Sequence, residues 1–317
     1  MGLIAQVQNL NGPLCAALAF ENREDELAQE LGPEFVKFGR LFIALQSRVV
    51  KKAPLIWAQD FWPETKLLPC PSITQGAAQL KKISPRWVLY SVENHRRAQL
   101  IQEKLKSWNF SAVDFMQKIE KKNFGAWTLL EKEWMLACAK TAGQTPLGEI
   151  QFIENRKFPP TRAYLKLWEL FTLHLNPPKK SDTVIDLGSC PGGWTWVLQS
   201  LGCKVISVDK APLDPKIAKL ARIEFMKKDA FALKPEDVPP LDWLFSDIIC
   251  TPEKLFELVQ KWRASGRVKN FVCTIKFKGK TDFVALQRFK DISGSVIIHL
   301  NHNKHEATWI LTEKTSS

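Results

Sequence analysis

Residues 186–194 read DLGSCPGGW and come directly after a short apolar segment that has the pattern of a strand. The segment 194–201 that follows has the pattern of a helix. A strand, a glycine-rich turn and a helix N-terminus together form a site for a nucleotide-type ligand. The turn contains Gly188, Gly192 and Gly193, and we expect these positions to lack side chains because a ligand lies against the backbone there.

The spacing of the glycines distinguishes between cofactors. A dinucleotide site uses G-x-G-x-x-G, which brings the pyrophosphate onto the helix N-terminus. This turn has G-x-x-x-G-G and begins with Asp186, whose carboxylate would repel a pyrophosphate. A carboxylate suits a ligand that carries an amino group and a sulfonium. The turn therefore indicates S-adenosylmethionine and argues against a dinucleotide oxidoreductase.

Strand-like and helix-like segments alternate from residue 182 to the C-terminus. This order predicts an α/β domain of Rossmann-like topology, with a mostly parallel sheet, helices on both faces and a C-terminal hairpin that adds one antiparallel strand. A helix is expected at 161–174, after the break at Phe158-Pro-Pro160, with Thr161 as its N-cap. The expected strands are 183–187, 204–208, 223–226, 242–246, 270–275, 295–300 and 307–312, and the expected helices are 194–201, 252–265 and 281–290.

Acidic residues recur where these strands end. Asp186, Asp209 and Asp247 close three strands, and Asp229 follows another. Ligands of an open α/β sheet bind at the carboxyl ends of the strands. Asp209 lies about twenty residues beyond the turn, where a carboxylate accepts hydrogen bonds from ribose hydroxyls. Asp229 is placed to accept a hydrogen bond from the adenine amino group. Each Asp taken alone also fits a helix cap or a turn.

Composition narrows the class of protein. The 317 residues are 45% apolar, enough for a globular chain of two domains. Lys and Arg exceed Asp and Glu by 45 to 33, a net charge of +12. This charge favours nucleic acid as a partner, although a solubilising surface explains it equally well.

The N-terminal half contains few distinctive features. Its strongest candidates for basic contacts to nucleic acid are Lys81-Lys82 and Arg96-Arg97. Pro-rich breaks are expected at Pro54, Pro63, Pro69 and Pro71.

Cysteine usage and the apolar segments bear on the compartment. Seven cysteines are scattered without a C-x-x-C pair, which argues against a disulfide framework and a structural zinc site and favours a reducing, cytoplasmic compartment. The apolar segment 14–20 is too short to span a membrane and is expected to be core. No membrane association is expected.

Five segments of the C-terminal half together resemble the FtsJ-like RNA ribose 2′-O-methyltransferases, and in particular the bacterial members that modify a cytidine ribose in 23S rRNA. The resemblance covers residues 155–312. The segments are PTRAYLKLWE (160–169), DLGSCPGGWT (186–195), SVD (207–209), SDIICTPEK (246–254) and Ile275-Lys276.

The resemblance implies a division of labour between two domains. Residues 156–317 would be the methyltransferase domain, and residues 1–155 an α+β RNA-recognition domain, THUMP-like. It also implies S-adenosylmethionine as cofactor, no metal, a monomer, and RNA, most of all 23S rRNA, as substrate. The cofactor-binding residues carried over are Asp186, Gly188, Ser189, Cys190, Pro191, Gly192, Gly193, Trp194, Asp209, Asp229 and Asp247.

The family's catalytic Lys-Asp-Lys-Glu tetrad falls, by resemblance, on Lys166, Asp247, Lys276 and Glu306. Lys278 and Lys280 are alternatives to Lys276. The parity of an extended strand would place Lys276 and Lys278 on one face, so spacing does not separate them. Each of these residues taken alone also fits an ordinary solvated side chain.

The reaction implied by the resemblance explains why such a tetrad is needed. A ribose hydroxyl is a weak acid, so its attack on a methyl group requires a base or strong polarisation together with in-line placement. We hypothesise that Lys276 activates the hydroxyl as a base or by polarising it. Lys166 and Asp247 would orient Lys276, and Glu306 would hold Lys166 or the ribose. A second lysine nearby lowers a lysine pKa and carboxylates raise it, so the four groups titrate together.

Other features carry weaker predictions. Cys190 lies in the turn but is not expected to act as a nucleophile. His299, His302 and His305 allow metal binding but fit a polar hairpin turn better. The remaining alternatives are 2′-O-methylation of tRNA or an mRNA cap, and an RNA-binding or assembly factor without turnover. The basic residues that could bind phosphates near the tetrad are Arg156, Lys157, Arg162, Lys179, Lys180 and Lys304.

Overall fold

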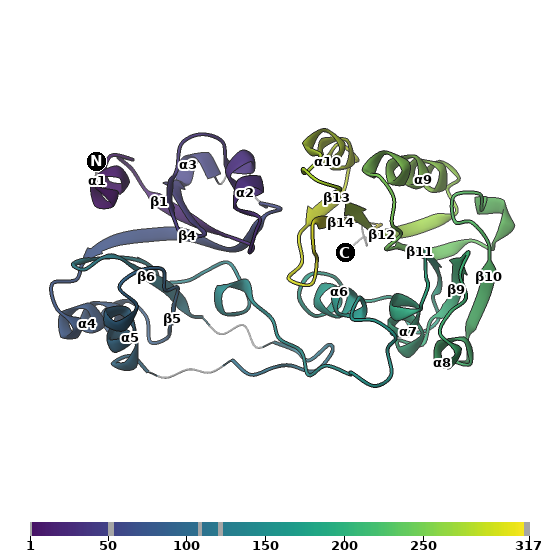
Figure 1. Cartoon of the computed structure of the whole chain (residues 1–317), viewed down its shortest axis with the longest axis horizontal. Helices are drawn as coiled ribbons and strands as arrows, with labels where there is room; N and C mark the ends of the chain where they lie inside the picture. Colours follow the sequence, from purple (N-terminus) through teal and green to yellow (C-terminus); the bar gives the residue numbers. More distant parts are fainter. Residues whose placement is uncertain (1, 50–53, 107–109, 120–122, 314–317) are drawn as a thin grey trace. The chain divides into compact units, whose positions relative to one another are not determined.

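The computed structural model of the chain describes residues 2–49, 54–106, 110–119 and 123–313. These residues form two compact units (Figure 1). The first comprises Met1–Val113 and Lys118–Gln151, and the second comprises Asp114–Gln117 and Phe152–Ser317. The division by contacts thus falls four residues before the predicted boundary at 155, and one short segment of the N-terminal half packs with the C-terminal unit.

The first unit is an α+β fold around a seven-stranded sheet in the order β2-β3-β1-β4-β7-β6-β5. Neighbouring strands are antiparallel except β5 and β6, which are parallel. The strands are β1 Leu14–Ala19, β2 Val36–Phe38, β3 Leu41–Leu45, β4 Ala58–Pro69, β5 Trp87–Leu89, β6 Gly125–Glu131 and β7 Trp134–Cys138. The helices are α1 Leu3–Gln8, α2 Glu24–Leu31, α3 Gln46–Val49, α4 Ile73–Ile83 and α5 His95–Glu103.

This sheet has a core on each face. On one face, α4 and α5 bury Leu80, Ala98 and Ile101 against Trp87 and Trp127. On the other face a second cluster gathers around Trp62 and includes residues of α1. Burial of strands on both faces explains why β1 reads as a continuous apolar run and not as an alternating one. The expectation that the segment 14–20 is core is therefore confirmed.

One predicted break in this unit is wrong. Pro63 lies inside β4, which pairs with strands on both sides. Between the pairs Leu14–Thr65 and Ala16–Trp62, strand β4 has one residue more than β1, so the ladder carries a bulge at Pro63 and Glu64. A bulge leaves a residue out of the ladder, so a proline without an N–H is tolerated there.

The second unit is a Rossmann-like α/β fold with strand order β10-β9-β8-β11-β12-β14-β13. All neighbouring strands are parallel except β14, which is antiparallel to both β12 and β13, as the predicted hairpin requires. The strands are β8 Thr183–Leu187, β9 Lys204–Asp209, β10 Ile223–Lys227, β11 Leu241–Ser246, β12 Val268–Lys276, β13 Ser295–Ile298 and β14 Glu306–Leu311. The α-helices are α6 Tyr164–Glu169, α7 Gly193–Ser200, α8 Pro215–Ala218, α9 Pro252–Ala264 and α10 Phe283–Lys290.

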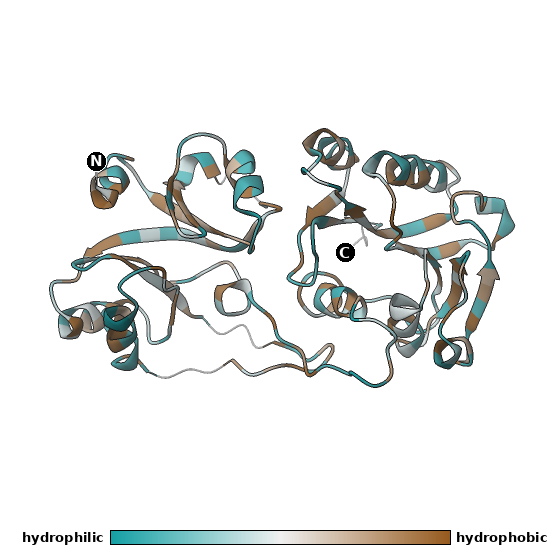
Figure 2. Ribbon diagram, in the orientation of Figure 1, coloured by the Kyte–Doolittle hydropathy of each residue, from teal (hydrophilic) through white to brown (hydrophobic). Residues whose placement is uncertain are grey.

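Helix amphipathicity places these helices on the sheet. Helix α9 alternates between polar and apolar residues in Figure 2 and buries Leu255, Leu258, Val259 and Trp262. Its N-cap is Thr251, whose hydroxyl accepts a hydrogen bond from the backbone N–H of Lys254. No helix among the described residues is long and apolar enough to cross a membrane.

The predicted helix at 161–174 is shorter and less regular than expected. Helix α6 begins at Tyr164 with Ala163 as its N-cap, and a π-helix continues it over Leu170–His174. Thr161 is therefore not a cap. Its hydroxyl lies only 2.9 Å from the place that a Cβ on Gly193 would occupy, so it packs against the start of α7 instead.

The packing of the first sheet predicts the effect of one substitution. A Cβ added at Gly125 in β6 would lie 2.5 Å from the Trp87 ring and 2.6 Å from the carbonyl oxygen of Cys138. We expect Gly125→Ala to lower the free energy of unfolding by about 1–3 kcal/mol, because neither neighbour can move away easily. Urea denaturation measures this change.

The matched control is Gly12→Ala, whose Cβ would meet only the end of the flexible Leu45 side chain at 3.0 Å. Equal stability of both variants would contradict this account of the sheet.

Candidate active site

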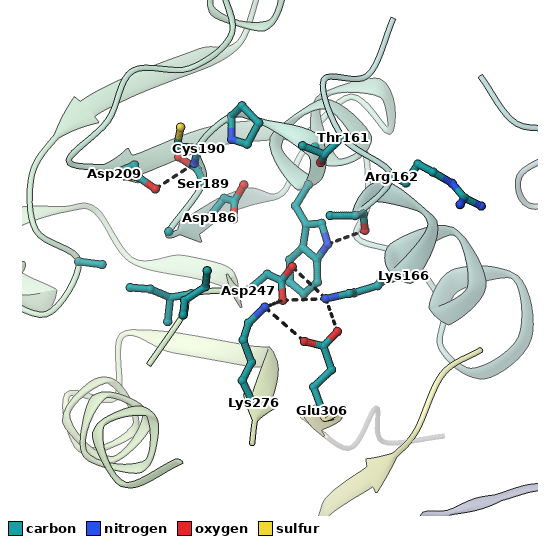
Figure 3. A pocket seen from close by; sticks show the side chains of 18 of the residues that line it. Thr161, Arg162, Lys166, Asp186, Ser189, Cys190, Asp209, Asp247, Lys276 and Glu306 are labelled. Carbon is teal, nitrogen blue, oxygen red and sulfur yellow. Dashed lines mark hydrogen bonds and ion pairs between the residues drawn. The ribbon is translucent and has the colours of Figure 1, made fainter. Parts of the chain in front are cut away.

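A cavity of about 990 Å³ opens at the carboxyl ends of the strands of the second unit (Figure 3). Its wall is built from the turn after β8, the ends of β9, β11 and β12, the start of α6 and the loop before β14. Of the fourteen residues predicted to be catalytic or cofactor-binding, thirteen line it: Lys166, Asp186, Gly188, Ser189, Cys190, Pro191, Gly193, Trp194, Asp209, Asp229, Asp247, Lys276 and Glu306.

The four residues of the predicted tetrad form a closed arrangement of alternating charges. The Lys166 ammonium lies 3.0 Å from Asp247 and 2.5 Å from Glu306. The Lys276 ammonium lies 2.8 Å from Asp247 and 3.3 Å from Glu306. Each amine thus contacts both acids, and each acid contacts both amines (Figure 3).

The fold explains how residues so distant in sequence meet. Lys276 ends β12 and Glu306 begins β14, and the two are directly opposite in the antiparallel ladder. Asp247 follows the neighbouring strand β11, and Lys166 comes from α6. Strand register therefore determines three of the four positions.

Electrostatics determines the state of Lys276. Burial disfavours the charge of its ammonium, but the carboxylates of Asp247 and Glu306 outweigh burial and hold the pKa of Lys276 above its ordinary value. The side chains of Lys166 and Glu306 are only 9% and 7% exposed, so water screens these charges weakly. In the ligand-free protein Lys276 is therefore protonated. The two carboxylates outweigh the effect of the second lysine.

The alternatives Lys278 and Lys280 lie outside this arrangement. Strand β12 ends at Lys276, so strand parity does not extend to Lys278. Both side chains are exposed, and neither lines the cavity.

Packing within the protein gives the glycines of the turn a second reason, besides the contact with a ligand that we expected. Gly188 and Gly192 have φ angles of +77° and +113°, which favour glycine. Added Cβ atoms would lie 2.8 Å from Ile248 at Gly188 and 2.9 Å from Ile217 at Gly192. Gly192 does not line the cavity. Close packing within the protein, in addition to any ligand, thus requires these glycines.

The acidic residues at the strand ends have unequal environments. Asp186 is buried and accepts a hydrogen bond from the Thr195 hydroxyl at 2.7 Å, and burial raises its pKa to about 7. Asp209 holds the turn, because its carboxylate accepts hydrogen bonds from the backbone N–H groups of Cys190 and Ala211. Asp229 pairs with Lys210 at 2.8 Å; hydrogen bonding to Lys210 is the main reason that its pKa lies below the ordinary value.

Ser189 presents a buried polar atom in the cavity wall that has no hydrogen-bond partner among the residues that the structure describes. Ser189 is 5% exposed, and its hydroxyl makes no hydrogen bond within the described residues. A buried hydroxyl without a partner is costly, so a ligand with polar groups would be stabilised at this position. The acidic strand ends and Ser189 together fit a ligand that carries both an amino group and a carboxylate.

The cysteine and histidine predictions have distinct outcomes. The Cys190 thiol donates a hydrogen bond to the carbonyl oxygen of Pro212, and burial raises its pKa, so it is a thiol and not a thiolate. His302 bonds to Glu169, His305 to Thr281, and His299 to the carbonyl oxygen of Glu306. The described residues contain no group of three or more His, Cys, Asp or Glu side chains arranged to hold a metal ion.

Of the six basic residues predicted to bind phosphates, only some lie at the cavity. Arg162 and Lys304 line the cavity, whereas the other four predicted phosphate-binding residues do not. The guanidinium groups of Arg162 and Arg156 lie 2.7 Å and 3.5 Å from the carboxylate of Glu154. Both arginine side chains remain largely exposed.

Sequence reasoning missed Glu169, Asn301 and the role of Thr195. Glu169 is 1% exposed and accepts hydrogen bonds from Asn301 and His302, which line the cavity. The available signal was a glutamate three residues after Lys166 on a helix that is otherwise apolar there. That spacing places both side chains on one face of the helix.

Comparison with known proteins agrees with the resemblance drawn from the sequence. Residues 160–290 match the family model of FtsJ-like methyltransferases. The "Ribosomal RNA large subunit methyltransferase M" of Thauera aminoaromatica is 30% identical over 171 residues, 49% of this chain and 46% of that protein. The protein of the same name from Histophilus somni (strain 2336) is 31% identical over 180 residues, half of each chain.

The matched region is confined to part of each protein. The chain spans about half the length of the curated relatives it matches. Among solved structures, a fibrillarin pre-rRNA processing protein of Methanococcus jannaschii is 18% identical with a TM-score of 0.35, covering 46% of this chain and 73% of that one. The similarity to FtsJ-like methyltransferases thus lies within the second unit, over residues 160–290.

Burial of Asp186 predicts a pH dependence of stability. Its pKa is about 7 in the folded, ligand-free protein, above the ordinary value of 3.8. Between these values the folded state holds a proton that the unfolded state has lost, so the free energy of unfolding falls as pH rises from about 4 to about 7. In Asp186→Asn this contribution is absent, while the amide oxygen can still accept from Thr195.

As the pH rises from 5 to 8, we expect the free energy of unfolding of Asp186→Asn to increase relative to that of the unaltered protein. Urea denaturation at each pH measures this difference. A stability difference between the two proteins that does not change with pH would contradict the buried, protonated state of Asp186.

Proposed function

We propose that this protein transfers a methyl group from S-adenosylmethionine to a ribose 2′-hydroxyl of large-subunit ribosomal RNA. The observation that carries the proposal is the arrangement of two amines and two carboxylates around one cavity. Its support outside the structure is the match to FtsJ-like methyltransferases and the printed names of the relatives. The resemblance favours a cytidine in 23S rRNA as the target.

The cavity divides into a cofactor half and a substrate half under this proposal. Asp186, Ser189, Asp209 and Asp229 lie at the ends of β8, β9 and β10, which are consecutive in the sheet. These residues would hold S-adenosylmethionine, which supplies a methyl group on a sulfonium when bound. Asp209 would accept from the ribose hydroxyls and Asp229 from the adenine amino group.

The tetrad would then act on the ribose hydroxyl. In the proposed reaction the 2′-oxygen would form a bond to the methyl group that the cofactor supplies, the cofactor would leave as a neutral thioether, and the hydroxyl would lose its proton. The proton needs an acceptor. Of the two lysines, Lys276 has the more exposed side chain, 21% against 9% for Lys166. Because Asp247 and Glu306 keep Lys276 protonated, it must first release a proton to water before it can accept one from the hydroxyl.

Lys166, Asp247 and Glu306 would position the groups that react. Lys166 is 9% exposed and contacts both carboxylates, so it holds them in place. With the carboxylates fixed, the Lys276 amine is held in one orientation, as in-line transfer requires. The first unit would help to select RNA, with exposed Lys81 and Lys82 at the end of α4 as candidate phosphate contacts.

The test of the reaction is transfer of labelled methyl from S-adenosylmethionine to an unmodified 23S rRNA transcript. We expect alkali-resistant linkages in the product, since a 2′-O-methyl group blocks cleavage of the neighbouring phosphodiester. Lys276→Ala should reduce turnover by about 10²–10⁴-fold, the usual contribution of a general base. Calorimetry should show S-adenosylhomocysteine binding within about twofold of the unaltered protein.

Methyl label on bases would contradict ribose methylation, and label confined to tRNA would replace rRNA as the substrate. RNA binding without any methyl transfer would favour an assembly factor. Retained turnover in Lys276→Ala would contradict the role of that lysine.

The raised pKa of Lys276 predicts how the rate depends on pH. The pKa of Lys276 lies above the ordinary value of 10.5. Below that pKa, the fraction of Lys276 that is neutral rises tenfold for each unit by which the pH increases. The logarithm of the rate constant for methyl transfer should therefore rise steadily between pH 7 and pH 9. Single-turnover methylation measures this, because it isolates the chemical step. A rate that is constant from pH 7 to pH 9 would show that Lys276 does not have to lose a proton.

A further inference from the structure

The loop that connects β13 to β14 is fixed by one buried carboxylate. Glu169 lies at the end of α6 and is 1% exposed. Its Oε1 accepts hydrogen bonds from the backbone and side-chain nitrogens of Asn301, at 2.7 Å and 2.9 Å. Its Oε2 accepts from the backbone nitrogen of His302 at 3.1 Å and from the Nδ1 of His302 at 2.6 Å.

These four hydrogen bonds define the chemistry of the carboxylate. Burial disfavours its charge, but the hydrogen bonds from His302 and Asn301 and the attraction of His302 outweigh burial and lower the pKa of Glu169. An ionised carboxylate only accepts hydrogen bonds, so the shared hydrogen lies on Nδ1 of His302. The remaining polar atom of the ring is Nε2, which makes no hydrogen bond within the described part of the chain.

The place of this loop in the sheet separates it from the cofactor half. The turn and the acidic residues lie at the ends of β8, β9 and β10, on one side of β11. Asn301, His302 and Lys304 lie in the loop between β13 and β14, on the other side of β11. All three line the same cavity as the tetrad.

The same loop leads directly into the tetrad. Glu306 follows it, and the backbone nitrogen of Lys304 donates to the Glu306 carboxylate at 3.4 Å. Glu169 and Lys166 share one face of α6, three residues apart. The helix that supplies one tetrad lysine therefore also holds the loop that precedes the tetrad glutamate.

We propose that the Asn301–His302 corner receives the target nucleotide, with Nε2 of His302 as a hydrogen-bonding contact to it and Glu169 as a positioning residue for the corner. This inference rests on the proposed methylation of RNA. Nε2 of the ring would form a hydrogen bond with a ribose hydroxyl of the nucleotide, a group that can both donate and accept. Lys304, on the same loop, adds a positive charge for a neighbouring phosphate.

Three variants of the full-length protein test the proposal. His302→Asn keeps an amide N–H near the position of Nδ1, so that the side chain can still donate to Glu169, but it removes Nε2. Glu169→Gln keeps the shape of the side chain but turns an amide N–H₂ toward two donors of the corner. Asp182→Asn is the matched control. Asp182 also accepts hydrogen bonds from a backbone nitrogen and a ring nitrogen, but it precedes β8, at the amino ends of the parallel strands and away from the cavity.

The readouts are the KM and kcat for an unmodified 23S rRNA transcript, and calorimetric binding of S-adenosylhomocysteine. We expect His302→Asn to raise the RNA KM by about three- to tenfold, the loss of one hydrogen bond, with kcat changed less than KM. Glu169→Gln should raise the RNA KM and also lower kcat, since the loop leads to Glu306. Binding of S-adenosylhomocysteine should change by less than about twofold in all three variants, and the control should match the unaltered protein.

Binding of the same transcript in the presence of S-adenosylhomocysteine, measured by filter retention, needs no turnover. It therefore tests the corner even if the unaltered protein transfers no methyl group, which would reject the proposed function separately. Unchanged RNA affinity in His302→Asn overturns the proposal. A loss of S-adenosylhomocysteine binding in His302→Asn also overturns it, because the corner would then belong to the cofactor half.

Discussion

The mutual neutralisation of Lys166, Asp247, Lys276 and Glu306 is the interaction on which the rest of the site depends. Four charges lie within a few ångströms of one another, with little water to screen them. A single amine or acid in such a place would be costly, and removal of one partner leaves another charge uncompensated. The same contacts hold Lys276 protonated in the ligand-free protein. The arrangement therefore fixes the positions of the four groups, but it also keeps the Lys276 amine protonated, so that the amine cannot accept a proton until it has lost one.

The sheet supplies that geometry. Parallel strands end at one edge, where Asp247 and the cofactor-half acids gather, and the antiparallel strand β14 begins at the same edge with Glu306. Because β14 runs against its neighbours, a residue at its start lies beside a residue at the end of β12. The hairpin from β13 to β14 is thus needed both to complete the sheet and to bring the fourth charge to the cavity.

Much of this was predictable from the sequence. The alternation of strands and helices, the turn at 186–194 and the acidic strand ends follow from local patterns, and the Rossmann-like fold is as expected. The pairing of Lys276 with Glu306 depends on register, which no local pattern determines, and it came only from the family resemblance. Thr161 was misassigned because its hydroxyl packs on Gly193, a contact between distant segments. Glu169 was missed because its two hydrogen-bonding partners, Asn301 and His302, lie more than 130 residues away in the sequence.

The central claim is that the cavity holds a methyl donor on one side of β11 with its reacting end toward the tetrad. The most direct measurement is a crystal structure of the protein with S-adenosylhomocysteine and a short ribonucleotide. The account predicts the adenosyl group beside Asp209 and Asp229, and a 2′-oxygen within about 3.5 Å of the Lys276 amine, as a near-attack geometry requires. An adenosyl group bound beside Asn301 and His302, or a sulfur atom facing away from Lys276, would contradict it.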